Sequence, residues 1–149
     1  MYAVILAGSS GTRQHALRAS EDPVSLRHTN HGRTLLRRIG DLIEPLVDPM
    51  DVVAVTDRRF GERVRVELPE ARILAEPMGR NTAASLALAT VAVQRPDDDQ
   101  MLVICADHEV GQDDAFREAM ATAAVEVVKG AAGVERPLVT FGIDRKSVV

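Results

Sequence analysis

Short apolar runs alternate with longer amphipathic stretches along the whole chain, and this alternation constrains the fold more than any other feature. The short runs have the length of strands and are residues 2–7, 51–56, 72–75, 101–105 and 138–143. The stretches between them show helical spacing or small-residue faces and are residues 35–43, 58–68, 83–92 and 113–129. Strands that alternate with helices form a parallel sheet. The sequence therefore predicts a three-layer α/β fold with a mostly parallel central sheet.

Size and composition point to one globular core. The chain has 149 residues, of which 46% are hydrophobic and 27% charged, and no repeat or linker divides it. We therefore predict a single domain over residues 1–149. The net charge of −4 and the scattered arginines lack the basic surface of a nucleic-acid-binding protein. No apolar run is long enough for a membrane span, and the single cysteine, Cys105, allows no internal disulfide. We expect a cytoplasmic protein that binds neither nucleic acid nor membrane.

Three loops that follow predicted strands carry the candidate site. In an open parallel sheet, ligands bind beyond the carboxyl ends of the strands. Residues 8–13 offer backbone N–H groups and the Arg13 guanidinium for phosphate oxygens, residues 76–82 offer polar groups for a base, and Asp107 offers a carboxylate for a divalent cation. Together these loops predict a site for a metal-bound nucleotide.

Each loop also has an ordinary structural interpretation. Glycines in a strand-to-helix turn commonly serve backbone geometry, and residues 8–11 lack both the P-loop lysine and the third glycine of the dinucleotide fingerprint. Asp107 could equally cap the turn that follows it. His15, His28 and His31 show no regular metal-ligand spacing. The residues alone therefore leave phosphate binding and metal binding open.

Taken in chain order, four segments resemble the N-terminal part of the mannose-1-phosphate guanylyltransferase family. The most specific is Glu76-Pro77-Met78-Gly79-Arg80-Asn81-Thr82-Ala83, which distinguishes the mannose-1-phosphate branch among sugar nucleotidyltransferases. The others are residues 2–13, 32–36 and 106–108, and the resemblance runs from Met1 to about Ile143. It implies a Rossmann-like nucleotidyltransferase fold and the Mg²⁺-dependent reaction of GTP with mannose 1-phosphate, which gives GDP-mannose and pyrophosphate.

The resemblance also implies a role for each matched residue. Arg13 matches the arginine that steadies the triphosphate while pyrophosphate departs, so it is the candidate catalytic residue. Asp107 matches the residue that holds Mg²⁺, and residues 76–83 match the guanine and ribose pocket. The candidate nucleotide-binding residues are Leu6, Ala7, Gly8, Ser9, Ser10, Gly11, Thr12, Arg13, Glu76, Pro77, Gly79, Asn81, Thr82 and Ala83.

The chain departs from the family pattern at three places. The family loop typically reads G-G-S-G-T-R-L-W-P-L, and the serine at position 9 costs about 1 kcal/mol if the backbone there needs a positive φ. Residues 21–26 replace a proline-lysine-proline element, so a phosphate-binding lysine is absent and two acidic residues stand nearby. The family also continues for roughly as much sequence again, and that half carries the sugar-phosphate site, a second lysine and a second metal carboxylate.

These departures leave several hypotheses about what the chain does. It is a guanylyltransferase that uses GTP and mannose 1-phosphate, a non-catalytic nucleotide-binding or regulatory half-domain that pairs with a full-length transferase, or a truncated inactive paralogue. A sheet without its second half would expose apolar edges and helix faces. We therefore expect a homo-oligomer or a partner chain that covers this surface.

Overall fold

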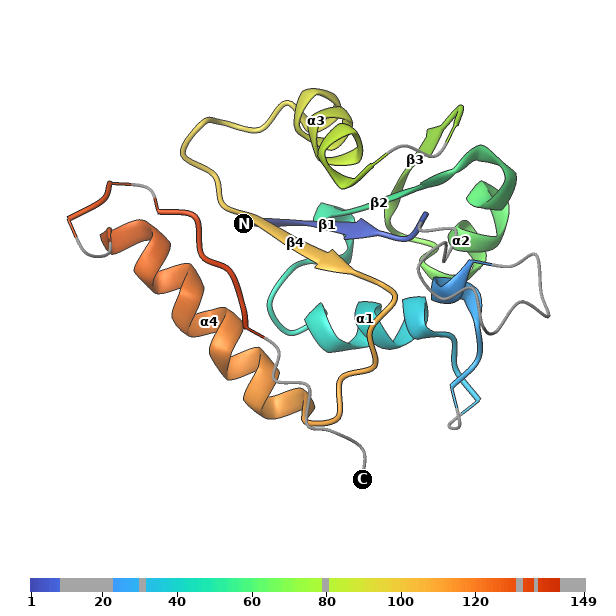
Figure 1. Ribbon diagram of the computed structural model, residues 1–149, viewed down its shortest axis with the longest axis horizontal. Helices are drawn as coiled ribbons and strands as arrows, with labels where there is room; N and C mark the ends of the chain where they lie inside the picture. The colour runs from blue at the N-terminus through green and yellow to red at the C-terminus, as the bar shows by residue number, and fades with distance from the viewer. Residues whose placement is uncertain (9–22, 30–31, 79–80, 131–132, 136, 143–149) are drawn as a thin grey trace. The chain divides into compact units, whose positions relative to one another are not determined.

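The computed structural model describes residues 1–8, 23–29, 32–78, 81–130, 133–135 and 137–142 (Figure 1). The chain divides into two compact units, Met1–Asp113 and Asp114–Val149. The first unit contains the sheet and is the part on which the candidate site depends. The single domain expected over residues 1–149 stays a prediction.

A parallel sheet forms the centre of the first unit, with strand order β3-β2-β1-β4. Its strands are β1 (Tyr2–Leu6), β2 (Val52–Asp57), β3 (Arg72–Glu76) and β4 (Met101–Cys105). Strand β1 lies in the middle, where Leu6 pairs with Val55 on one side and Cys105 on the other. The predicted parallel sheet is confirmed for these strands.

Helices cover both faces of this sheet. The α-helices of the first unit are α1 (Leu35–Ile43), α2 (Gly61–Glu67) and α3 (Thr82–Val93). Short 3-10 turns supplement them at η2 (Val24–Leu26), η3 (Pro49–Asp51) and η4 (Arg58–Phe60). Figure 1 shows α3 on one side of the sheet and α1 on the other, which is the three-layer arrangement predicted from the sequence.

The alternation of side chains along the strands divides the core between these two faces. Tyr2, Val4, Val53 and Val55 form one buried cluster with Ala89 of α3. The intervening strand residues are also fully buried and are Ala3, Ile5, Ala54 and Thr56. Because both faces of β1 are covered, its sequence is apolar without interruption rather than alternating.

The second unit contains helix α4 and one region where the sequence prediction is wrong. Helix α4 (Asp113–Lys129) has the predicted bounds. The strand expected over residues 138–143 does not form. Residues 138–142 have no regular secondary structure, and Leu138 is 92% exposed. Ile143 lies outside the described residues. An apolar, β-branched segment becomes a strand only when a neighbouring strand supplies its hydrogen bonds. No described strand pairs with this segment.

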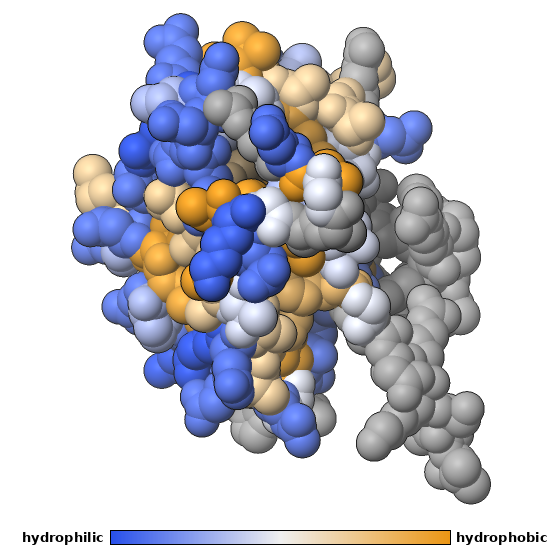
Figure 2. Space-filling view, turned by 90° about the vertical axis from the view of Figure 1, so that its left-hand side faces the viewer, coloured by the Kyte–Doolittle hydropathy of each residue, from blue (hydrophilic) through white to orange (hydrophobic). Residues whose placement is uncertain are grey.

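Apolar side chains also reach the surface in both units. Figure 2 shows such patches in orange between charged residues in blue on one face of the molecule. The exposed apolar residues of α3, β4 and α4 are Leu88, Val91, Met101, Val103, Val125 and Val128. The expected exposure of apolar surface is confirmed, whereas the homo-oligomer or partner chain stays a prediction.

We predict that Gly8→Ala lowers the free energy of unfolding by about 1–3 kcal/mol, because an added Cβ would lie 3.2 Å from both the Thr56 Cα and the Asp57 backbone nitrogen. Gly61→Ala is the matched control, since an added Cβ there meets nothing within 4 Å, and it should leave stability unchanged or raise it. Urea denaturation of both variants measures the difference. Equal stability of the two variants would contradict the close approach of Gly8 to β2.

Candidate functional site

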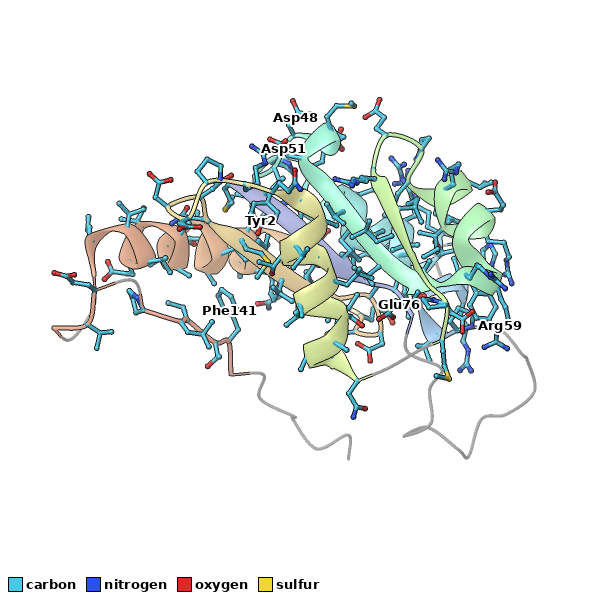
Figure 3. The ribbon with its side chains drawn as sticks, turned by 90° about the horizontal axis from the view of Figure 1, so that it is seen from above. Tyr2, Asp48, Asp51, Arg59, Glu76 and Phe141 are labelled. Atoms are coloured by element: carbon cyan, nitrogen blue, oxygen red, sulfur yellow. The ribbon has the colours of Figure 1, made fainter. Side chains whose placement is uncertain are left out.

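The carboxyl ends of the strands lie along one edge of the sheet, because all the strands run in the same direction. Figure 3 shows Glu76 and Arg59 at this end of the sheet and Asp48 and Asp51 at the opposite end. We call this edge the rim, and its residues are Leu6, Ala7, Gly8, Asp57, Glu76, Pro77, Asn81 and Asp107. Ligands of open parallel sheets bind at such an edge.

Part of the predicted site falls within the described residues and part does not. Residues 9–13, with the candidate catalytic Arg13, and Gly79 lie outside the described residues. The structure places the other candidates on the rim or in the first turn of α3: Leu6, Ala7, Gly8, Glu76, Pro77, Asn81, Thr82, Ala83 and Asp107. The three predicted loops therefore begin or end at the same edge of the sheet.

Strand β1 enters the rim through tightly held backbone. The Ala7 N–H donates to the Val55 carbonyl at 2.8 Å, and the Ala106 N–H donates to the Leu6 carbonyl at 3.1 Å. Gly8 then passes directly against the end of β2. Glycine at this position therefore serves a close backbone approach, which was the structural interpretation of the loop. Phosphate binding by residues 8–13 stays a prediction.

The carboxylates that follow the strands differ in their hydrogen-bond partners. Asp57 accepts hydrogen bonds from the Arg59 backbone N–H at 2.9 Å and from its guanidinium at 3.1 and 3.0 Å. Glu76 is 7% exposed and accepts a hydrogen bond from the Ser85 hydroxyl at 3.0 Å. Both groups are therefore already engaged by protein donors, and Glu76, which the resemblance places in the guanine pocket, connects β3 to α3.

Asp107 has a different environment. Its Oδ1 atom is buried and accepts no hydrogen bond from the described residues, although His108 Nδ1 lies 2.9 Å away. A buried carboxylate oxygen without a hydrogen bond is costly unless another partner satisfies it. The Asp107 side chain as a whole is 33% exposed, so a cation at the rim can reach its carboxylate. The described ranges contain no group of three or more His, Cys, Asp and Glu side chains that could hold a metal ion.

Hydrogen bonds from Arg38 of α1 hold the segment that follows Asp107. Arg38 Nη2 donates to the Val110 carbonyl and to Asp113 Oδ1, at 3.2 Å in each case. These contacts join residues more than 70 positions apart in the chain. They restrain the backbone that carries Asp107, and no sequence motif indicated a role for Arg38.

The opposite end of the rim presents the start of α3. Asn81 occupies the N-cap position, as the sequence allowed, but its side chain makes no capping hydrogen bond. The side chains of Asn81, Thr82 and Ala83 are exposed. The amide of Asn81 can both donate and accept hydrogen bonds. This end of the rim therefore offers polar groups that the described fold does not use.

The two ends of the rim are well separated. Strands β3 and β4 lie at opposite edges of the described sheet, three strand spacings apart, which corresponds to roughly 14 Å. A ligand that reaches the ends of both β3 and β4 must therefore be elongated. Asn81 itself lies five residues beyond β3, and its helix α3 packs on β1 and β2 through Ala89.

Ser25 and Thr56 also lie close to the rim, although sequence analysis did not single them out. The Ser25 hydroxyl donates to the Ala7 carbonyl at 2.7 Å. The Thr56 hydroxyl is buried and has no hydrogen-bond partner in the described part of the chain. Neither residue belongs to a motif, and the contact of Ser25 joins it to a residue 18 positions away in the chain.

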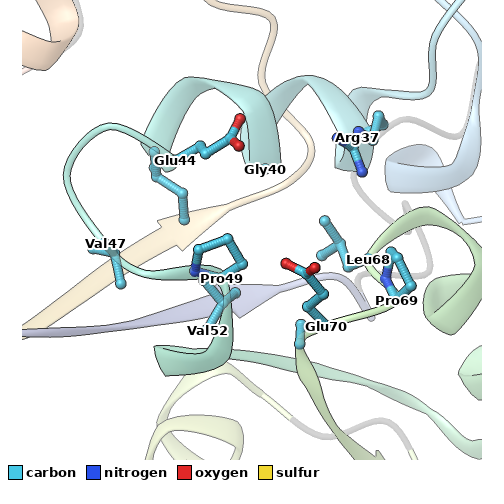
Figure 4. A pocket seen from close by; sticks show the side chains of 11 residues that line it. Arg37, Gly40, Glu44, Val47, Pro49, Val52, Leu68, Pro69 and Glu70 are labelled. Carbon is cyan, nitrogen blue, oxygen red and sulfur yellow. The ribbon is translucent and has the colours of Figure 1, made fainter.

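The described residues also enclose a cavity that lies away from the rim. A cavity of about 240 Å³ lies at the amino ends of β2 and β3, between α1 and residues 47–52 and 68–71 (Figure 4). None of the predicted site residues lines it.

None of the helices in the described ranges is long and apolar enough to span a membrane.

Cys105 fits the structural interpretation that its apolar neighbours suggest. It is half-buried at the end of β4. Burial raises the pKa of the Cys105 thiol, and the charge of Asp107 raises it further. A thiol with a raised pKa stays protonated at neutral pH and is a weak nucleophile.

We predict that Arg59→Ala raises the pKa of Asp57. The Arg59 side-chain hydrogen bonds, followed by its backbone N–H, hold the pKa of Asp57 below the ordinary value. Because the folded-state pKa is lowered, the stabilisation is present above the unfolded pKa of about 4 and is lost as the pH falls through the folded pKa. The variant should therefore lose less stability than the wild type on acidification.

Carboxyl-detected NMR titration of Asp57 and urea denaturation between about pH 2 and 7 measure both effects. Arg58→Ala is the control, since the charge of Arg58 lowers the Asp57 pKa least among the causes. An equal shift in both variants would show that the Arg59 hydrogen bonds are not responsible.

Known proteins resemble this chain in sequence and in fold. The model of the nucleotidyl transferase family matches residues 2–143. The mannose-1-phosphate guanylyltransferase of Escherichia coli strain K12 is 35% identical over 151 residues, which cover 96% of this chain and 30% of that protein. The alginate biosynthesis protein AlgA of Pseudomonas fluorescens is 35% identical over 152 residues, which cover 96% of this chain and 29% of that protein.

A solved structure of a related protein also matches this chain in fold and in sequence. The crystal structure of mannose-1-phosphate geranyltransferase from Thermus thermophilus matches with a TM-score of 0.72 and 34% identity, over 81% of this chain and 36% of that chain. The α/β nucleotidyltransferase fold and the resemblance to mannose-1-phosphate guanylyltransferases are thereby confirmed. The chain spans about 30% of the length of the curated relatives it matches. Because the family model covers nearly the whole sequence, the chain belongs to the nucleotidyl transferase family.

Proposed function

We propose that the rim binds GTP together with Mg²⁺, as the nucleotide-binding part of a mannose-1-phosphate guanylyltransferase. In this reaction GTP and mannose 1-phosphate give GDP-mannose and pyrophosphate. The observation that carries the proposal is the Asp107 Oδ1 atom, which is buried at the carboxyl edge of the sheet and accepts no hydrogen bond from the described residues. Similarity to the E. coli guanylyltransferase supports the choice of nucleotide and sugar phosphate.

The rim fits a cation that is shared with phosphates. Mg²⁺ prefers oxygen ligands and commonly takes one or two carboxylates together with phosphate oxygens and water. Asp107 supplies a carboxylate that is 33% exposed and has His108 Nδ1 2.9 Å from its Oδ1 atom. When bound, the ion supplies positive charge against the phosphate oxygens. The Ala106 N–H to Leu6 carbonyl hydrogen bond and the Arg38 contacts hold the backbone on either side of Asp107.

The other rim residues have complementary parts in the proposal. The exposed amide of Asn81 and the first turn of α3 contact the base and ribose, and Glu76 holds β3 against that turn through Ser85. The resemblance assigns the triphosphate to residues 8–13, with Arg13 as the catalytic residue that stabilises the departing pyrophosphate. In this proposal the phosphate end lies at the ends of β1 and β4, and the base end lies beside the start of α3.

A second function is favoured by the segment where the family has its proline-lysine-proline element. In this chain η2 (Val24–Leu26) follows Pro23, and its three side chains are buried and carry no positive charge. A site without that cation stabilises the triphosphate less in the transition state. The alternative function is therefore a nucleotide-binding half-domain that does not catalyse turnover by itself and acts with a full-length transferase.

We predict that Asp107→Asn removes most of the effect of Mg²⁺ on GTP binding. Loss of one charged ligand should weaken the Mg²⁺-dependent affinity by about tenfold or more, while binding without Mg²⁺ changes little. Isothermal titration calorimetry with GTP, with and without Mg²⁺, measures this. Asp48→Asn is the matched control at the opposite end of the sheet, where Asp48 caps η3 through the Met50 N–H and asparagine can do the same.

Two results would overturn the proposal. Wild-type protein that binds no GTP at millimolar concentration would remove the nucleotide site. An Asp107→Asn variant with the same Mg²⁺ dependence as Asp48→Asn would remove Asp107 from it. A pyrophosphate-release assay with mannose 1-phosphate, run with and without a full-length transferase, then separates the enzyme from the non-catalytic half-domain.

A further inference from the structure

We propose that Ser25 is a positioning residue that sets the orientation of the Ala7–Gly8 peptide at the rim and thereby the affinity for nucleotide. The inference rests on the proposed function, because affinity for GTP is one of its readouts. No motif assigns Ser25 a role, and it lies within the segment that departs from the family pattern.

The contact between Ser25 and Ala7 is short and buried. Ser25 is 3% exposed, Ala7 is fully buried, and the Ser25 hydroxyl donates to the Ala7 carbonyl at 2.7 Å. Ala7 is the first residue after β1, so its carbonyl lies beyond the end of that strand. A side chain 18 positions away therefore satisfies a backbone group at the rim.

This bond fixes more than one atom. A peptide unit is planar and trans, so a carbonyl held in one direction also holds the following N–H in the opposite direction. The Ala7 carbonyl is held by Ser25, and the next residue, Gly8, lies against Thr56 and Asp57 of β2. The Gly8 N–H is thus a backbone donor with a set direction at the start of the predicted phosphate loop.

The turn that carries Ser25 is itself well anchored. Val24 and Leu26 on either side of Ser25 are 6% and 4% exposed. The Arg27 N–H donates to the Val24 carbonyl at 3.1 Å, and the Leu35 N–H donates to the Arg27 carbonyl at 3.0 Å at the start of α1. Ser25 therefore reaches the rim from a packed element, which is what a positioning group requires.

The test compares nucleotide affinity with stability in the same variants. Ser25→Ala removes the donor, and Ser25→Thr keeps a hydroxyl. Ile43→Val is the control, because Ile43 is fully buried in α1 and lines the cavity at the amino end of the strands, away from the rim. The Tm of each variant and its Kd for GTP with Mg²⁺, measured well below Tm, are the first readouts.

We expect Ser25→Ala to raise the Kd for GTP by about tenfold, within the range that one charge-assisted hydrogen bond to a phosphate contributes. Ile43→Val should lower Tm without changing Kd, and Ser25→Thr should restore the affinity. If the added methyl group of threonine prevents folding, Ser25→Cys, with similar size and a weak donor, should give an intermediate Kd.

A second readout does not depend on nucleotide. The Gly8 amide resonance in a ¹H–¹⁵N spectrum of the free protein should move in Ser25→Ala and return in Ser25→Thr. Wild-type affinity in a folded Ser25→Ala variant, or an equal rise in Kd for Ile43→Val, would overturn the positioning role alone. Absence of GTP binding by the wild-type chain would instead overturn the proposed function, which keeps the two failures distinct.

Discussion

The site depends on β1 being hydrogen-bonded along both of its sides. Its ladders with β2 and β4 continue to Ala7 and Ala106, so the three strand ends are held in one register at the rim. Burial of both faces of β1 against helices makes this register costly to change, since a shift by one residue would move its apolar side chains to the wrong layer. The loops that leave these strands therefore start from fixed positions.

The polar groups at the rim are divided between structural and available roles. Asp57 is held by Arg59 and Glu76 by Ser85, so these carboxylates complete the ends of β2 and β3. Asp107 differs from both, since its buried Oδ1 atom accepts no hydrogen bond from the described residues and lies 2.9 Å from His108 Nδ1. The distribution of donors, rather than the number of acidic residues, indicates where a cation would add stabilisation.

The parallel sheet and the helix positions followed from the sequence because they depend on patterns within short segments. The apolar runs at residues 2–7 and 101–105 identified β1 and β4, and parallel topology then placed Gly8 and Asp107 at one edge. Residues 138–143 have the same kind of composition, but a strand also needs a neighbour, which composition does not encode. The contacts of Ser25 and Arg38 were not predictable for a related reason, since they join segments that meet only in the folded chain.

In the proposed function the rim contacts one ligand at two places, the start of α3 and the ends of β1 and β4. Under the proposed function, a nucleoside alone would engage only the polar groups near Asn81, and free polyphosphate only those near Gly8 and Asp107. Because a nucleoside triphosphate links the nucleoside and the polyphosphate covalently, binding of one part raises the effective concentration of the other part at its own binding place. Discrimination against the separate fragments would then arise from the spacing of the two binding places, which the sheet and α3 set.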